Sequence, residues 1–197
     1  CNDTKVGADN KLTGDPTETA LIDMGFTLDF QPSIFEDMPR VKEIPFDSDR
    51  KLMTTVNKRD GKYYVFTKGG IDELLKRCNK YLINGEVKED LNNYIPEIKK
   101  HNEDMASDAL RVLAMAYKIL DHEPTDEEMK NMESDLIYVG MVGMIDPPRE
   151  EVKIAVEKCK SAGIKTVMIT GDHKSTAVAI AKDLGILCEG DKAITGS

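Results

Sequence analysis

Residues 51–70 read KLMTTVNKRDGKYYVFTKGG, a pattern that points to two β-strands joined by a tight turn. The strands are expected at Lys51–Asn57 and Lys62–Thr67, where β-branched and aromatic residues are frequent. Between them, Lys58-Arg59-Asp60-Gly61 is a hairpin signal, because Asp-Gly readily adopts the backbone angles of such turns. These residues therefore predict a pair of antiparallel neighbours in one sheet.

Further elements are expected on both sides of this hairpin. Upstream, Val41–Phe46 predicts another strand, and a short helix is expected from Pro16 to about Met24, with Asp15 as its cap. Strands that follow one another through hairpins predict an α+β domain with an antiparallel sheet flanked by helices. Downstream, the expected elements are helix Ile71–Cys78, a turn at Asn84-Gly85, helix Leu91–Ala109, strand Val112–Ile119, a short acidic helix from Pro124 and strand Ile137–Ile145.

The pattern changes at Asp146-Pro147-Pro148-Arg149. Helix and strand alternate after this segment, which is typical of a parallel, doubly wound sheet. We therefore expect one domain over residues 1–145 and an incomplete α/β segment over residues 146–197, with a hinge between them. The elements expected in the second segment are helix Glu150–Ala162, strand Ile164–Ile169 and helix Ser175–Leu184.

The composition is typical of a globular protein, with 40% hydrophobic and 32% charged residues among 197. A net charge of −9, with no basic stripe carrying aromatic residues, argues against a nucleic-acid-binding protein. The cysteines show neither metal-ligand spacing nor a disulfide framework, so no metal site is expected. No apolar run approaches the ~20 residues that span a bilayer. The chain begins at Cys1 rather than Met, and we expect it to be a piece of a longer protein.

Thr170-Gly171-Asp172 stands where a predicted strand meets a predicted helix. The N-terminus of a helix presents backbone N–H groups and a partial positive charge to an anion. Thr170 adds a hydroxyl and Asp172 a carboxylate at this point. The arrangement is the kind found in half of a phosphoryl-transfer site.

Two other segments have both a ligand-binding interpretation and a structural one. Lys68-Gly69-Gly70 ends a predicted strand with a charge suited to phosphate, followed by glycines that let a ligand approach the backbone. The same residues also fit an ordinary turn with a surface lysine. Phe46 can stack on a purine ring with Arg50 and Lys51 nearby for phosphates, or it can belong to the core while these charges are solvated.

Two charged residues also have a structural interpretation. Arg111 lies in an apolar context between a predicted helix and a predicted strand, so its charge needs a partner. A ligand phosphate would serve, and so would a carboxylate in a structural ion pair. Glu18 falls where a capping box needs an acidic residue, and capping alone accounts for it.

Taken together and in this order, the segments resemble the cytoplasmic part of P-type cation-transporting ATPases, in the branch of the calcium pumps. The resemblance covers essentially the whole chain, and the ordered set is more specific than any of its members. The matching segments are Cys1-Asn2-Asp3, Gly14-Asp15-Pro16-Thr17-Glu18-Thr19-Ala20-Leu21, Phe46-Asp47-Ser48-Asp49-Arg50-Lys51-Leu52-Met53, Phe66-Thr67-Lys68-Gly69-Gly70, Leu110-Arg111-Val112-Leu113-Ala114, Asp146-Pro147-Pro148-Arg149 and Thr170-Gly171-Asp172.

The resemblance implies that residues 1–145 are a nucleotide-binding domain. Residues 146–197 would be a truncated phosphorylation domain of haloacid-dehalogenase-like fold. In the first domain, Phe46 would stack on the adenine of ATP. Lys68, with Gly69 and Gly70, would form the floor of the pocket, and Lys51 would be its companion.

The resemblance also implies roles for residues outside that pocket floor. Glu18 would meet the adenine, and Arg111 would bridge the two domains through the phosphates. Thr170 would bind the transferred phosphoryl group, with Gly171 and Asp172 on the nucleotide side of it. The hinge would consist of Asp146, Pro147, Pro148 and Arg149.

The chain departs from the family pattern at three places. The segment with the phosphorylated aspartate would precede Cys1, and the segment with the Mg²⁺-binding aspartate would follow Ser197. Ser48 stands where many calcium pumps have arginine. We therefore expect Thr170 and Asp172 to form only part of a catalytic site, and the chain alone to bind ATP or ADP without hydrolysing it.

The whole protein that the resemblance implies is an integral membrane pump. It would use ATP with Mg²⁺ to transport a cation, calcium by resemblance. This chain would lie on its cytoplasmic side, at the plasma membrane, with the other pump domains and the membrane helices as partners. Two alternatives are a haloacid-dehalogenase-type phosphatase with a large cap and a nucleotide-binding module without turnover.

Overall fold

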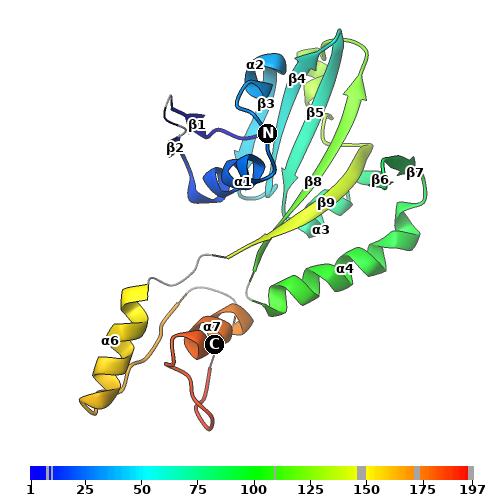
Figure 1. Cartoon of the computed structure of the whole chain (residues 1–197). Helices are drawn as coiled ribbons and strands as arrows, with labels where there is room; N and C mark the ends of the chain where they lie inside the picture. The colour runs from blue at the N-terminus through cyan, green and yellow to red at the C-terminus, as the bar shows by residue number, and fades with distance from the viewer. Residues whose placement is uncertain (8, 10, 109, 146–149, 171–173, 195–197) are drawn as a thin grey trace. The chain divides into compact units, whose positions relative to one another are not determined.

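The computed structural model describes residues 1–7, 9, 11–108, 110–145, 150–170 and 174–194 (Figure 1). The chain forms two compact units. The first contains residues 1–96 and 113–142, and the second contains residues 97–112 and 143–197.

The strands of the described residues form a seven-stranded sheet in the order β3-β4-β5-β8-β9-β6-β7. Pairing is antiparallel between β3 and β4, β4 and β5, β5 and β8, and β6 and β7, whereas β6 and β9 run parallel. The α+β prediction with a mainly antiparallel sheet is therefore confirmed, with one parallel pair that local patterns did not indicate. The strands are β3 (Arg40–Asp47), β4 (Leu52–Arg59), β5 (Lys62–Gly69), β6 (Cys78–Ile83), β7 (Glu86–Lys88), β8 (Arg111–Leu120) and β9 (Leu136–Met144).

Helices flank the sheet close to their predicted positions. The Asp15 side chain caps α1 by accepting a hydrogen bond from the amide of Thr17 at 2.8 Å, as predicted. The helix predicted over residues 71–78 ends at Leu75, because Cys78 already belongs to β6. The helices are α1 (Pro16–Thr27), α2 (Ile34–Asp37), α3 (Ile71–Leu75), α4 (Leu91–Ser107), α5 (Asp126–Met129), α6 (Glu150–Ser161) and α7 (Lys174–Asp183), and a small ribbon of β1 (Lys5–Val6) and β2 (Leu12–Thr13) precedes α1.

The two faces of β5 have different surroundings, because successive strand residues point to opposite sides. Tyr63 and Val65 are buried in a core cluster with Val56 and Met132, the latter just after α5. Lys68, on the opposite face, bonds to Glu18 of α1. Helix α1 therefore contacts one face of the sheet, and the segment that follows α5 packs against the other (Figure 1).

The second unit corrects one prediction. Residues 164–169 were expected to form a strand, yet they have no regular secondary structure, and Ile164, Val167 and Ile169 are 58%, 73% and 93% exposed. A strand forms only when its backbone groups find partners, and no described strand pairs with this segment. Helices α6 and α7 do form, and Val156 and Ala181 are buried.

Candidate functional site

The end of the hairpin brings several predicted site residues together. In the sheet register, Asp47 of β3 pairs with Leu52 of β4, which pairs with Gly69 of β5. The end of β3, the start of β4 and the end of β5 therefore lie at one end of the sheet. Phe46 and Lys68, which immediately precede Asp47 and Gly69, lie at this end too.

The Phe46 ring is on the surface, with 62% of the residue exposed. A large exposed aromatic side chain loses contact with water when a flat ligand covers it, which favours stacking. The alternative interpretation of Phe46 as a core residue is therefore wrong for this chain.

Lys68 and Glu18 form a salt bridge that is largely shielded from water. Their side chains are 10% and 14% exposed, and the second carboxylate oxygen of Glu18 accepts a hydrogen bond from the amide of Asp3 at 2.8 Å. The interpretation of Lys68 as a surface lysine is wrong, because the residue is only 8% exposed. Capping alone does not account for Glu18, since its carboxylate binds the end of β5.

The glycine after Lys68 allows the backbones of β4 and β5 to meet closely. A Cβ atom on Gly69 would lie 2.1 Å from the carbonyl oxygen of Lys51. The same carbonyl accepts a hydrogen bond from the amide of Gly70 at 3.0 Å. Lys51 has a positive φ of 55° and an exposed side chain that forms no ion pair within the described part of the chain.

Sequence reasoning placed Arg50 near the phosphates and missed its pairing with Glu133. Arg50 binds the carboxylate of Glu133, with 3.2 Å from Nη1 to each oxygen. Glu133 is 7% exposed and lies 83 positions away along the chain. No local pattern names a partner at that distance; the only signal was an acidic residue directly after the apolar Met132.

The remaining predicted residues belong to the second unit or lie outside the described residues. Arg111 is the first residue of β8, is exposed and belongs to the second unit. Thr170 is exposed in the same unit. The other predicted positions, Gly171, Asp172, Asp146, Pro147, Pro148 and Arg149, lie outside the described residues.

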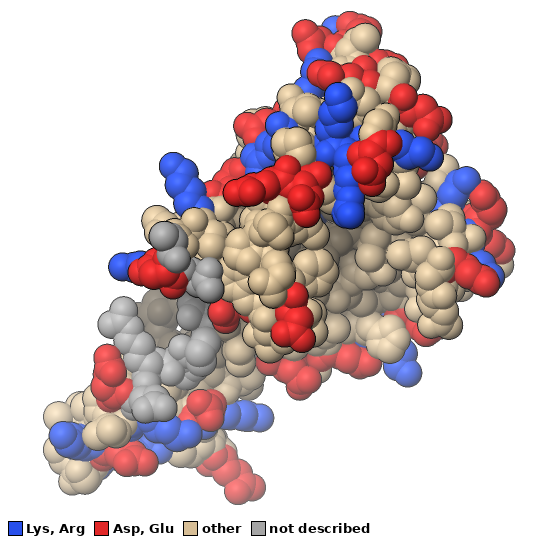
Figure 2. Space-filling view, turned by 45° about the horizontal axis from the view of Figure 1, so that its top comes forward, with Lys and Arg blue, Asp and Glu red and all other residues tan. Residues whose placement is uncertain are grey.

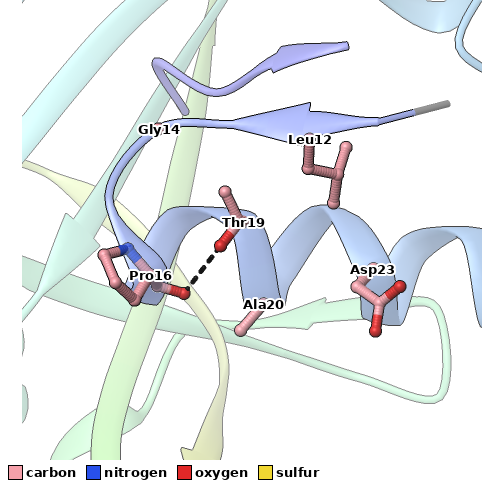
Figure 3. A pocket seen from close by; sticks show the side chains of 6 residues that line it. All are labelled: Leu12, Gly14, Pro16, Thr19, Ala20 and Asp23. Atoms are coloured by element: carbon pink, nitrogen blue, oxygen red, sulfur yellow. Dashed lines mark hydrogen bonds between the residues drawn. The ribbon is translucent and has the colours of Figure 1, made fainter. Parts of the chain in front are cut away.

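Two hollows of the first unit lie beside the predicted site rather than at it. One, of about 390 Å³, lies between β2 and α1 and is lined by residues such as Leu12 and Ala20 (Figure 3). The other, of about 530 Å³, is lined by Arg50 and Glu133 among others. Neither lining includes Phe46 or Lys68. Figure 2 shows basic side chains intermingled with acidic ones on one face of the molecule.

The described residues contain no group of three or more His, Cys, Asp or Glu side chains placed to hold a metal ion. They also contain no helix with the length and apolar character needed to cross a membrane.

Comparison with known proteins matches residues 1–151 to the family model of the P-type ATPase cytoplasmic domain N. Calcium-transporting ATPase 1 of Lactococcus lactis is 47% identical over 201 residues, which cover 100% of this chain and 22% of the relative. Calcium-transporting ATPase 1 of Bacillus cereus is 48% identical over 196 residues, covering 96% and 21%. Cation-transporting ATPase pma1 of Synechocystis is 42% identical over 195 residues, covering 97% and 21%.

The matched region contains the predicted residues Glu18, Phe46 and Lys68 and all seven strands of the sheet. The chain spans 21–22% of the length of these three relatives. Similarity of this extent over nearly the whole chain removes the alternative of a phosphatase with a large cap. The chain belongs to the P-type ATPases, and residues 1–151 belong to their cytoplasmic domain N.

Proposed function

We propose that this chain is the ATP-binding part of a cation-transporting pump and that residues 1–145 bind the nucleotide. The observation that carries the proposal is the combination of an exposed Phe46 ring with a shielded Lys68–Glu18 pair at one end of the sheet. An aromatic face and a polar group beside it are the elements that hold a nucleobase by stacking and hydrogen bonding.

The charges at this end suggest how the nucleotide would lie. Lys68 is paired with Glu18, so this part of the site is close to neutral and suits the uncharged adenine. Lys51 is exposed and forms no ion pair among the described residues, so its charge is open to phosphates. We therefore assign the base to Phe46 and the Lys68–Glu18 pair, and the phosphate tail to Lys51. Gly69 and Gly70 would let the ligand approach the backbone.

The second unit would take part in phosphoryl transfer. We propose that residues 146–197 belong to a haloacid-dehalogenase-like phosphorylation domain, with Asp146, Pro147, Pro148 and Arg149 as its hinge. Arg111 would meet the phosphates when the domains close. Thr170, Gly171 and Asp172 would bind the transferred group, while the acceptor aspartate would come from another segment of the pump. This chain alone would bind ATP or ADP and hydrolyse neither.

The whole protein would couple ATP hydrolysis, through an aspartyl-phosphate, to cation transport across the plasma membrane. Two of the relatives are named as calcium-transporting ATPases, which favours calcium as the cation. Mg²⁺ would offset the charge of the phosphates, and its protein ligands would lie in other segments. This chain would then be a cytoplasmic domain whose partners are the other pump domains and the membrane helices.

Titration of the chain with adenosine and with ATP, followed by NMR, tests the assignment. Phe46→Ala removes the stacking ring and is expected to weaken both ligands by about 1–3 kcal/mol. Lys51→Met removes a charge but not the ring, so it is expected to weaken ATP and leave adenosine nearly unchanged. This split follows because only ATP carries phosphates.

Lys62→Met is a matched control, since Lys62 lies at the far end of β5. It should change neither affinity, although it removes one positive charge, as Lys51→Met does. Equal affinities of wild type and Phe46→Ala for adenosine would contradict the base site. Equal losses of ATP and adenosine in Lys51→Met would contradict the phosphate assignment.

A further inference from the structure

We infer that Arg50 and Glu133 are positioning residues, which fix the turn bearing Phe46 and Lys51 relative to the strand bearing Lys68. The inference rests on the proposed nucleotide site, and it adds two residues that would act on the ligand only through others. Neither side chain belongs to the base or phosphate contacts proposed above.

Arg50 ties together the two strands that flank the turn. Its Nη2 atom donates hydrogen bonds to the carbonyl oxygens of Pro45 at 2.7 Å and Leu52 at 3.1 Å. Pro45 directly precedes Phe46, and Leu52 directly follows Lys51. One guanidinium therefore holds both ends of the segment that carries the proposed ligand-binding side chains.

Asp47 shapes the turn from within. Its carboxylate oxygen accepts hydrogen bonds from the amides of Asp49 at 3.0 Å and Arg50 at 2.8 Å. The amide of Lys51 donates to the carbonyl oxygen of Asp47 at 2.6 Å. These bonds are local to the turn, so they define its shape but not its position on the sheet.

Glu133 supplies the connection to the rest of the sheet. Besides Arg50, its carboxylate accepts a hydrogen bond from the hydroxyl of Thr54 at 2.8 Å. The hydroxyls of Thr54 and Thr67 lie 2.9 Å apart, and both residues are fully or almost fully buried. Thr67 immediately precedes Lys68, so a chain of hydrogen bonds runs from the turn to the strand of the pocket lysine.

This chain of hydrogen bonds lies on the back of the site. Thr54 and Thr67 are register partners on the face opposite Lys68, where no ligand contact is proposed. Burying a carboxylate and a guanidinium has a desolvation cost that an apolar pair would avoid. The Arg50–Glu133 pair fixes the position of the turn that carries Phe46. This role accounts for the desolvation cost, because stacking depends on where the ring is held.

A double-mutant cycle on adenosine affinity tests the inference. Arg50→Lys keeps the charge, but one ammonium cannot reproduce the planar fork that reaches two carbonyls and a carboxylate. We expect Arg50→Lys to weaken adenosine about tenfold when Phe46 is present, the loss typical of a charged hydrogen bond. In the Phe46→Ala background, the same change should have almost no further effect. Adenosine is used because it has no phosphate for the charge of Arg50 to attract.

Glu133→Gln is a second variant that keeps the shape of the side chain and its acceptor oxygen for Thr54. It should also weaken adenosine only in the presence of Phe46. Tyr63→Phe is the control, because it removes the hydrogen bond to Glu123 (3.3 Å) at the far end of β5 and should not change the affinity. Folding of every variant is checked from the spread of its amide resonances.

The possible results distinguish the positioning role of Arg50 and Glu133 from the proposed nucleotide site itself. Losses that are the same with and without Phe46, or unchanged affinity in both Arg50→Lys and Glu133→Gln, would overturn the positioning role. Phe46→Ala without any effect on adenosine would overturn the nucleotide site itself. Loss of affinity in the Tyr63→Phe control would show a general response to weakening the sheet, and would also count against positioning.

Discussion

Gly69 shows how much of this site depends on a single absent side chain. The carbonyl of Lys51 and the side chain of Leu52 occupy the space that a Cβ atom on Gly69 would need, at 2.1 and 2.7 Å. The neighbouring Gly70 differs, because a Cβ there would meet only the Lys51 side chain at 3.8 Å. Position 69 therefore has no room for a side chain, whereas position 70 does.

Gly69→Ala is expected to lower the free energy of unfolding by about 3 kcal/mol, because β4 and β5 must separate to admit the methyl group. Gly70→Ala is the matched control and should change the stability by less than about 1 kcal/mol. Urea denaturation of both variants measures the difference. Similar stabilities for the two would contradict the close approach of Lys51 and Gly69.

At the scale of elements, the strands with a local signal were predicted within about two residues of their ends. The hairpin of β4 and β5 follows from Asp60-Gly61, where the φ angles are 51° and 75°. The parallel pairing of β6 with β9 was not predictable, because it joins segments without a shared turn. The strand expected at residues 164–169 does not form. Its apolar pattern likewise does not specify a partner strand.

The site residues show the same difference between partners that are close in the sequence and partners that are distant. The role of Asp15 in capping was predictable because its partner lies two residues away. The Lys68–Glu18 and Arg50–Glu133 pairs join residues 50 and 83 positions apart, and only the folded sheet brings them together. The resemblance named Lys68 and Glu18 as site residues but did not indicate that they bind each other.

Helix α5 offers a test of local electrostatics. The amide of Thr125, then the His122 ring and the Thr125 hydroxyl, stabilise the charged form of Glu128 and lower the pKa of its carboxyl from 4.5 to about 2. A carboxyl with a lower pKa in the folded chain stabilises the fold above the unfolded pKa. The contribution of Glu128 should therefore be present above pH 4.5 and decline as the pH falls from 4.5 toward 2.

The ¹³C shift of the Glu128 carboxyl, followed during acid titration, should show a midpoint near 2 in the wild-type chain. In His122→Ala the midpoint should rise, because one of the stabilising partners is removed. A midpoint of 4.5 for Glu128 in the wild-type chain would contradict the capping geometry.

At the scale of the whole molecule, the two units differ in how much regular, buried structure they contain. Residues Leu52–Val56 of β4 are all buried, and β5 pairs with a strand on each side. In the second unit, residues 165–169 have no regular structure although the segment contains apolar side chains. Backbone protection should therefore differ sharply between β5 and this segment.

Hydrogen exchange should reveal this difference directly. Amides of β5 are expected to exchange only on global unfolding, because their hydrogen bonds are central in the sheet. Amides of residues 165–169 are expected to exchange with an opening free energy of about 0 kcal/mol. Mass spectrometry of peptides from the two regions measures both rates, and comparable protection would contradict the absence of strand pairing in the second unit.

The order of strands in the sheet has a consequence during translation. β6 and β7 are made before β9, but β6 joins the sheet only beside β9, with β7 at the edge. At about 5–20 residues per second, the ribosome needs roughly 3–11 s to proceed from the end of β7 to the end of β9. Ile83 and Val87 of this nascent hairpin are 36% and 42% exposed even after folding. Slow codons between residues 89 and 135 would lengthen the time in which the hairpin is open to mispairing with other newly made chains.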